Sequence, residues 1–177
     1  SPFLCVRGTG EAWNPAIQAW SDASLKRFAY EWHRYFRGEL PIKNDTEVTP
    51  EDAERYNLIL FGDPGSNLWI KRVLPELPIA WTRDRIEIGK DRYAATDHVP
   101  LLINPNPVAP GRYVVINSGH TFREKELASL NYLLFPRSGD WAVVKIAREA
   151  SDLTKEETIR AGLFDERWRL AAPGGVR

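Results

Sequence analysis

The sequence predicts an α/β fold, with helices on both faces of a mainly parallel sheet. Two observations predict it. Largely apolar runs at 58–61, 113–116 and 141–146 are typical of strands that are covered on both faces. Helical patterns alternate with these runs, and strand–helix–strand connections put their strands parallel. We therefore expect a three-layer domain, flavodoxin-like or Rossmann-like in outline, with an antiparallel hairpin inserted near 81–96.

Length and composition place this fold in one globular domain. The 177 residues match the usual size of a single domain, and 43% apolar with 27% charged residues is ordinary for a globular protein. The 24 basic and 24 acidic residues balance, which argues against a dedicated nucleic-acid binder. No apolar run approaches the roughly 20 residues that a membrane-spanning helix needs. We expect one domain over 1–170 and a flexible tail over 171–177.

The first half of the chain predicts two strands and three helices. A strand at 3–7 is followed by a long helix that starts at Asn14-Pro15 and ends at Gly38. A short helix begins at Thr49-Pro50, a strand follows at 58–61, and a third helix runs over 68–77. The core face of the long helix is predicted to carry Ile17, Trp20, Leu25, Phe28, Trp32, Tyr35 and Phe36.

The second half predicts the hairpin, three strands and two helices. The hairpin turns at Gly89-Lys90-Asp91, and Pro100 suggests that a strand at 99–103 lies at an edge or begins there. Further strands are expected at 112–117 and 141–146. Helices are expected at 123–134 and 152–162.

Small polar turns follow the buried strands and form the candidate site. In an open parallel sheet, ligands bind beyond the carboxyl ends of the strands, and helix N-termini there favour an anion. The alternative is structural: Gly and Asn make the turns, Ser66 or Thr121 caps a helix, and the Asp63 carboxylate already occupies the favourable field. The predicted ligand-binding residues are Gly62, Asp63, Gly65, Ser66, Asn67, Asn117, Ser118 and His120.

We expect no catalytic residues, no cofactor and no metal site. The chain has no nucleotide-binding fingerprint, no G-x-S-x-G elbow, one cysteine (Cys5) and no metal-type histidine spacing. A hydrolase that uses Ser118 and His120 remains an alternative, although two triad members in one turn are unusual. Asp97 is not expected to orient His98, because neighbouring side chains on a strand point to opposite faces.

Tryptophans offer a further alternative, a carbohydrate-binding module. Trp20, Trp32 and Trp69 fall on helix faces that are expected to be buried. Trp81 and Trp168 lie near segment ends, so we expect these two to be exposed if any are.

Several runs in order along the chain resemble one protein family. They include Phe3–Arg7, Tyr35–Pro41, Asn44–Thr46, Leu60–Asn67, His98–Pro100, Pro105–Pro107, Arg112–Val115, Asn117–Phe122, Asp140–Val143 and Ala161–Asp165. They resemble the C-terminal region of secreted bacterial proteins of the prolyl-oligopeptidase family of serine peptidases and esterases.

The resemblance implies a role beside a catalytic module. In that family an α/β-hydrolase domain precedes this region and carries the nucleophile elbow, and no segment here matches those catalytic motifs. It therefore implies a non-catalytic accessory domain whose partner is the upstream hydrolase domain of the same polypeptide, together with that domain's carbohydrate or peptide substrate. It also implies a secreted or periplasmic location.

Overall fold

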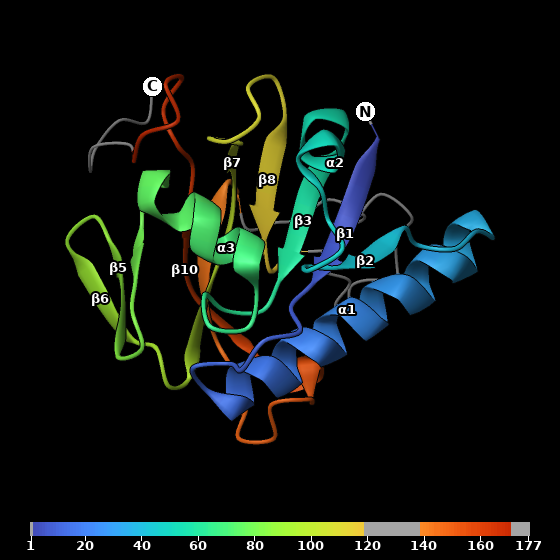
Figure 1. Cartoon of the computed structure of the whole chain (residues 1–177). Helices are drawn as coiled ribbons and strands as arrows, with labels where there is room; N and C mark the ends of the chain where they lie inside the picture. Colours follow the sequence, from blue (N-terminus) through green and yellow to red (C-terminus); the bar gives the residue numbers. More distant parts are fainter. Residues whose placement is uncertain (1, 119–138, 171–177) are drawn as a thin grey trace.

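The computed structural model describes residues 2–118 and 139–170, and these residues form two sheets (Figure 1). The main sheet has seven strands in the order β10-β9-β7-β8-β3-β1-β2, and the second sheet has the order β4-β5-β6. The main-sheet strands are β1 (Phe3–Arg7), β2 (Ile42–Asn44), β3 (Asn57–Phe61), β7 (His98–Pro105), β8 (Tyr113–Ile116), β9 (Trp141–Lys145) and β10 (Glu157–Gly162). The second-sheet strands are β4 (Ala80–Trp81), β5 (Arg85–Ile88) and β6 (Asp91–Ala94).

The described helices are three α-helices and two short 3-10 helices: α1 (Pro15–Phe36), α2 (Pro50–Arg55), α3 (Leu68–Val73), η1 (Leu74–Glu76) and η2 (Leu153–Lys155). The predicted helix starts are confirmed. The Asn14 side chain caps α1, and Thr49 with Asp52 forms a capping box at α2. No helix in this part of the chain is both long and apolar enough to cross a membrane.

The prediction of a three-layer, mainly parallel sheet is wrong. Only β2, β1, β3 and β8 run parallel; β8 pairs antiparallel with β7, β7 with β9, and β9 with β10. The predicted hairpin is confirmed as β5 and β6, but β4 joins it in a separate antiparallel sheet. Connection length explains the difference. The loop between β7 and β8 covers only 106–112, and a parallel crossover needs a dozen or more residues.

Two smaller predictions are also corrected. Residues 152–162 were expected as a helix, but they form η2 and then β10, which pairs with β9 through an irregularity at Ile159. Strand β7 is internal, although Pro100 suggested an edge. The Ile103 N–H donates to the backbone carbonyl of Asp140, on the β9 side of the strand. Backbone nitrogens alternate between the two sides of a strand, so the nitrogen of Pro100 faces the β8 side. There β8 has already ended, because its last residue, Ile116, pairs with Leu102. The proline therefore removes no hydrogen bond from the sheet.

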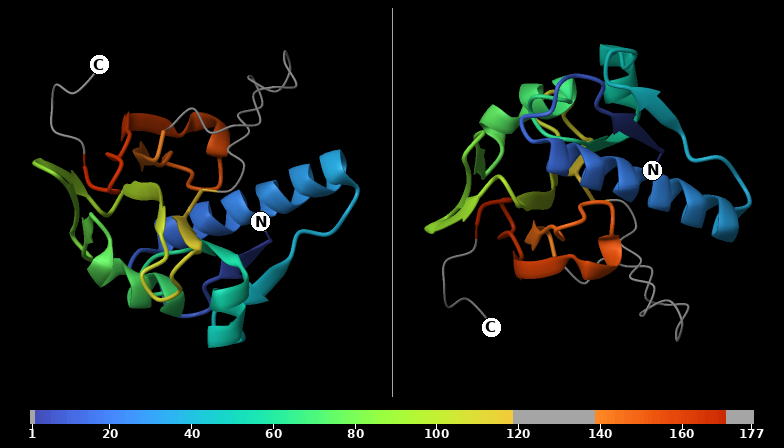
Figure 2. Two further views of the ribbon diagram at one scale, coloured as in Figure 1. Left: turned by 90° about the horizontal axis from the view of Figure 1, so that it is seen from above. Right: turned by 90° about the horizontal axis from the view of Figure 1, so that it is seen from below.

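Side chains that alternate along β1 and β3 enter two different cores. Leu4, Val6, Leu58 and Leu60 join the larger core, which includes α3, whereas Cys5 and Phe61 pack with Leu25 and Phe28 of α1. Figure 2 shows the same division, with α1 on one face of these strands and α2 and α3 on the other. The predicted helix at 123–134 and the predicted tail at 171–177 lie outside the described residues.

Candidate functional site

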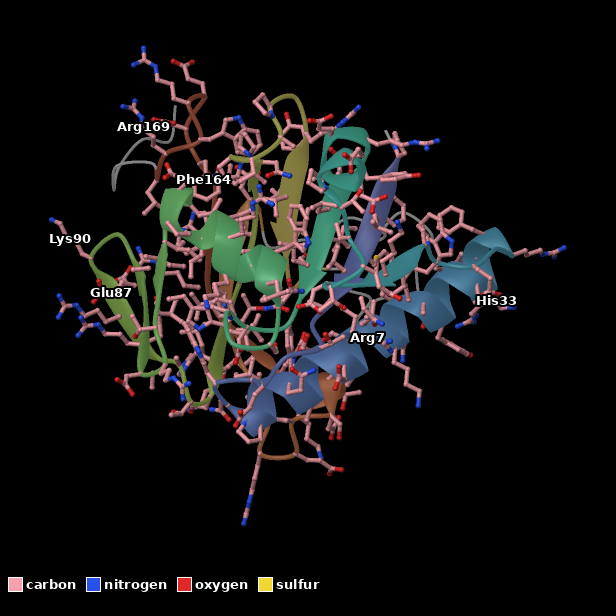
Figure 3. The ribbon with its side chains drawn as sticks, in the orientation of Figure 1. Arg7, His33, Glu87, Lys90, Phe164 and Arg169 are labelled. Atoms are coloured by element: carbon pink, nitrogen blue, oxygen red, sulfur yellow. The ribbon has the colours of Figure 1, made fainter. Side chains whose placement is uncertain are left out.

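The turns that follow β1, β2, β3 and β8 meet at one edge of the main sheet. Six of the eight predicted residues come together there: Gly62, Asp63, Gly65, Ser66, Asn67 and Asn117. Ser118 follows directly and is half-buried, while His120 lies outside the described residues. Figure 3 labels Arg7, the last residue of β1, which lies at this edge. We call these connected turns the strand-end network.

The Asp63 carboxylate is at the centre of the strand-end network. It is 1% exposed. Its Oδ1 accepts hydrogen bonds from the backbone N–H groups of Gly65 and Ser66, both at 2.9 Å, and its Oδ2 accepts one from Trp13 at 2.8 Å. These are the N–H groups that an anionic ligand would need. The geometry favours the structural alternative for this turn, and ligand binding there stays a prediction.

Two asparagines tie β3 to its neighbours. Asn67, rather than Ser66, caps α3: its Oδ1 accepts from Trp69 and Ile70, and its Nδ2 donates to the carbonyls of Val6 and Phe61. Asn117 exchanges two hydrogen bonds with the backbone of Gly62, at 2.9 and 2.7 Å. Asn117 has a φ of 52°, a left-handed conformation that asparagine tolerates better than most residues.

Asp45 is a second buried carboxylate that the sequence reasoning did not place in this network. Its Oδ1 accepts from the N–H and the hydroxyl of Thr9, and its Oδ2 accepts from the N–H of Leu68. It is 2% exposed. Its partners Thr9 and Leu68 lie 36 and 23 residues away in the chain, so no local pattern points to them. Asp45 joins the turn after β2 to those after β1 and β3.

Glycines allow the turns after β1 and β3 to touch. A Cβ at Gly8 would lie 2.6 Å from the carbonyl oxygen of Ser66, and one at Gly10 would lie 2.8 Å from that of Gly65. The N–H of Gly10 donates to the Ser66 carbonyl at 2.8 Å. The two backbones are therefore in direct contact, with no space between them for a ligand.

His98 and Asp97 form a pair that contradicts the sequence-based expectation. The His98 Nδ1 lies 2.7 Å from the Asp97 Oδ1 and 3.0 Å from the carbonyl oxygen of Ala94. Asp97 lies in the turn before β7 and not on the strand, so strict alternation does not apply to it. Two acceptors at Nδ1 favour a proton on that nitrogen. Asp97 also lies 3.7 Å from Lys145 Nζ, so the pair is part of a surface ion network.

The remaining candidate residues are dispersed. His33 is exposed on α1 and lies 3.4 Å from Glu39. Cys5 is fully buried, and burial raises the pKa of its thiol far above the ordinary value, which leaves it unreactive. Among residues 2–118 and 139–170, no group of three histidine, cysteine or acidic residues could hold a metal ion.

The C-terminal end of α1 carries exposed aromatic side chains that the sequence placed in the core. Tyr35 and Phe36 are 40% and 54% exposed, and Ile42 of the neighbouring edge strand β2 is 39% exposed. We call these three residues the α1 aromatic surface. Figures 1 and 2 show why they are exposed: α1 continues past the edge of the sheet, beyond β2.

The burial of the tryptophans differs in part from the prediction. Trp20 and Trp69 are buried as expected, and Trp32 is half-buried. Trp81 is also buried, at 5% exposure, because it packs into the larger core with Ile86 of the second sheet; its expected exposure is wrong. Trp168 is half-buried.

In comparisons with known proteins, no protein-family model, no curated protein and no solved structure matches this chain.

Proposed function

We propose that this chain is a non-catalytic accessory domain that packs against the catalytic module of a serine hydrolase through the α1 aromatic surface. The observation that carries the proposal is this exposed aromatic surface at an edge of the fold. Exposed apolar patches of this kind mark protein interaction sites. The motif resemblance described above supplies the identity of the partner, an α/β-hydrolase module of the same polypeptide.

The position of the first strand supports this partner. Phe3 of β1 packs edge-on against Trp32, with ring centroids 5.1 Å apart, and Trp32 packs against Phe36 at 4.4 Å. A module joined ahead of β1 would therefore be tethered beside the α1 aromatic surface. Such a tether raises the local concentration of the module, so even a modest interface would stay formed.

Charge around the surface specifies the partner further. Arg34 and Arg37 are exposed at the same end of α1, and the Arg34 guanidinium lies over the Tyr35 ring at 5.6 Å. Aromatic residues and arginine are the types most enriched at the energetic centres of interfaces. The docking face of the hydrolase module should therefore be apolar at its centre and acidic at its rim.

The strand-end network supports a non-catalytic role. Its buried carboxylates accept backbone N–H groups, so they are occupied in holding the turns. The isolated 177-residue chain should therefore not hydrolyse p-nitrophenyl esters or peptides. Turnover that Ser118→Ala abolishes would overturn the non-catalytic proposal.

Hydrogen exchange tests the docking proposal. The complete protein encoded by the gene is compared with the isolated chain, and the amides of residues 28–44 should exchange more slowly in the complete protein. Phe36→Lys, at an exposed position of the α1 aromatic surface, should remove this protection, while Leu163→Lys, at an exposed position just after β10, should leave it unchanged. Equal exchange in both proteins would overturn the proposal, as would a dimer of the isolated chain that Phe36→Lys dissociates.

A further inference from the structure

Strand β2 is an open edge of the main sheet. It is the last strand in the order, and among the described strands it pairs with β1 alone (Figure 1). The Cys5 N–H donates to the Pro41 carbonyl at 2.9 Å, so the Pro41 carbonyl faces β1. Because backbone groups alternate between the two sides of a strand, Ile42 and Asn44 direct their N–H and C=O groups away from β1. An open edge of this kind can pair with a strand of another molecule.

Glu47 bonds both outward backbone groups of Asn44. The Glu47 Oε2 accepts from the Asn44 N–H at 3.0 Å, and the Glu47 N–H donates to the Asn44 carbonyl at 3.0 Å. In an antiparallel sheet, two facing residues exchange one N–H···O bond in each direction. Glu47 therefore occupies the position that a residue of an added strand would take. By contrast, the Ile42 N–H and C=O make no hydrogen bond within the described part of the chain.

The β2 edge is self-complementary in one symmetric arrangement of two copies. If two β2 strands paired antiparallel about a two-fold axis at Lys43, Ile42 of each copy would face Asn44 of the other. Each facing pair would exchange two hydrogen bonds, so every bond of this pairing needs the Asn44 backbone. The two Lys43 side chains would meet at the axis, but each ammonium lies 2.7 Å from the Asp52 carboxylate of its own copy, which offsets their repulsion.

We propose that Glu47 prevents this chain from pairing with a second copy of itself at the β2 edge. While Glu47 holds Asn44, the symmetric pairing cannot form without first breaking both of its hydrogen bonds. Without the Glu47 carboxylate, the edge presents open donors and acceptors next to the exposed Ile42 side chain. Natural edge strands are commonly protected against such pairing by charged side chains, and Glu47 gives this protection through direct bonds to the backbone.

The role of Glu47 is independent of the docking proposal. It concerns the backbone of β2 and is measured on the isolated chain, where no hydrolase module is present. Ile42 takes part in both proposals, but Phe36→Lys leaves the backbone of β2 unchanged. Dimerisation of a Glu47 variant and loss of protection in Phe36→Lys can therefore succeed or fail separately.

Sedimentation velocity of the 177-residue chain and its variants tests the role of Glu47. The original chain should remain monomeric at concentrations up to about 1 mM, whereas Glu47→Ala should dimerise with a dissociation constant at least roughly tenfold lower than that of the original chain. Glu47→Ser should dimerise in the same way, because the serine side chain is too short to reach the Asn44 N–H. This second variant keeps the test decisive if the alanine variant does not fold.

The controls separate edge pairing from loss of charge and from unfolding. Glu39→Ala removes the same charge from an exposed position beside His33 and should remain monomeric. Ile42→Pro added to Glu47→Ala should restore the monomer, because proline removes an outward N–H and is tolerated on an edge strand. Thermal unfolding should show that the compared variants are folded. The proposal is overturned if folded Glu47 variants associate no more than the original chain, if Glu39→Ala associates as strongly, or if the dimer persists with Ile42→Pro.

Discussion

The parallel and antiparallel halves of the main sheet hold their loops together in different ways. In the parallel half, side chains join turns that are far apart in sequence: Asp63 reaches Trp13, Asn117 reaches Gly62 and Asp45 reaches Thr9. In the antiparallel half, the loop 106–112 joins β7 to β8, and residues 146–156, which include η2, join β9 to β10. Tight turns cannot connect parallel strands, because each connection must run from the end of one strand back to the start of the next, at the other end of the sheet.

This difference teaches why the strand-end residues look like a ligand site in the sequence. Glycine, asparagine, serine and aspartate at strand ends are what a phosphate-binding turn needs, and they are also what a self-sufficient turn needs. In this chain the second use is visible in the hydrogen bonds. The parallel half should therefore lose more stability than the antiparallel half when one such residue is changed.

The largest effect is expected at Asp63. Asp63→Asn replaces one acceptor oxygen by an NH2 group that faces a backbone donor, which leaves buried N–H groups unpaired. Chemical denaturation should show a loss of about 2–4 kcal/mol in the free energy of unfolding. Asp140→Asn is the matched control in the antiparallel half, because the Asp140 carboxylate accepts one backbone N–H, from Phe164. Equal losses of unfolding free energy in the two variants would mean that the two halves of the sheet do not differ in this respect.

A smaller effect is expected where the turns after β1 and β3 touch. Gly8→Ala places a methyl group 2.6 Å from the Ser66 carbonyl oxygen, and only a backbone shift can relieve that contact. Overpacking of this kind costs about 1–3 kcal/mol, which the midpoint of thermal unfolding should report. Gly38→Ala, with its nearest neighbour 3.9 Å away, is the control and should change little. A Gly8→Ala protein as stable as the control would mean that the two turns are not tightly packed.

The parts of the fold that depend on local interactions could be predicted from the sequence, and those that depend on contacts between distant segments could not. The starts of α1 and α2 and the positions of β1, β3, β8 and β9 came from local signals, namely caps and apolar runs. Strand direction depended on the length of each connection. The alternation of helical patterns and apolar runs suggested parallel strands throughout and did not reveal the short loop between β7 and β8. The segment at 152–162 carries a helix-like pattern, but pairing with β9 turns Glu157–Gly162 into a strand. This is a tertiary effect that local propensity does not contain.

The same distinction applies to the residues of the candidate site. Asp63 and Asn67 were found because a turn after an apolar run is a local feature. Asp45 was missed because its partners, Thr9 and Leu68, are 36 and 23 residues away. The exposure of Tyr35 and Phe36 was missed because helical spacing gives the face of a helix but not the point where the sheet beneath it ends.

The smallest effect is a pH dependence at α2, on the rim of the parallel half. The side-chain hydrogen bond from Lys43, at 2.7 Å, and the Thr49 N–H lower the pKa of Asp52 below 3.8. A lowered pKa in the folded state stabilises the fold above the unfolded-state pKa, and this contribution disappears as the pH falls through the folded-state pKa. Asp52→Asn should therefore cost about 0.5–1 kcal/mol at pH 7, and the difference from the original chain should shrink steadily below about pH 4. Glu54→Gln on the same helix has neither partner and should show no such trend. Thermal unfolding of the three proteins from pH 7 to pH 3 measures this, and a difference that stays constant with pH would show that the Asp52 charge does not stabilise this rim.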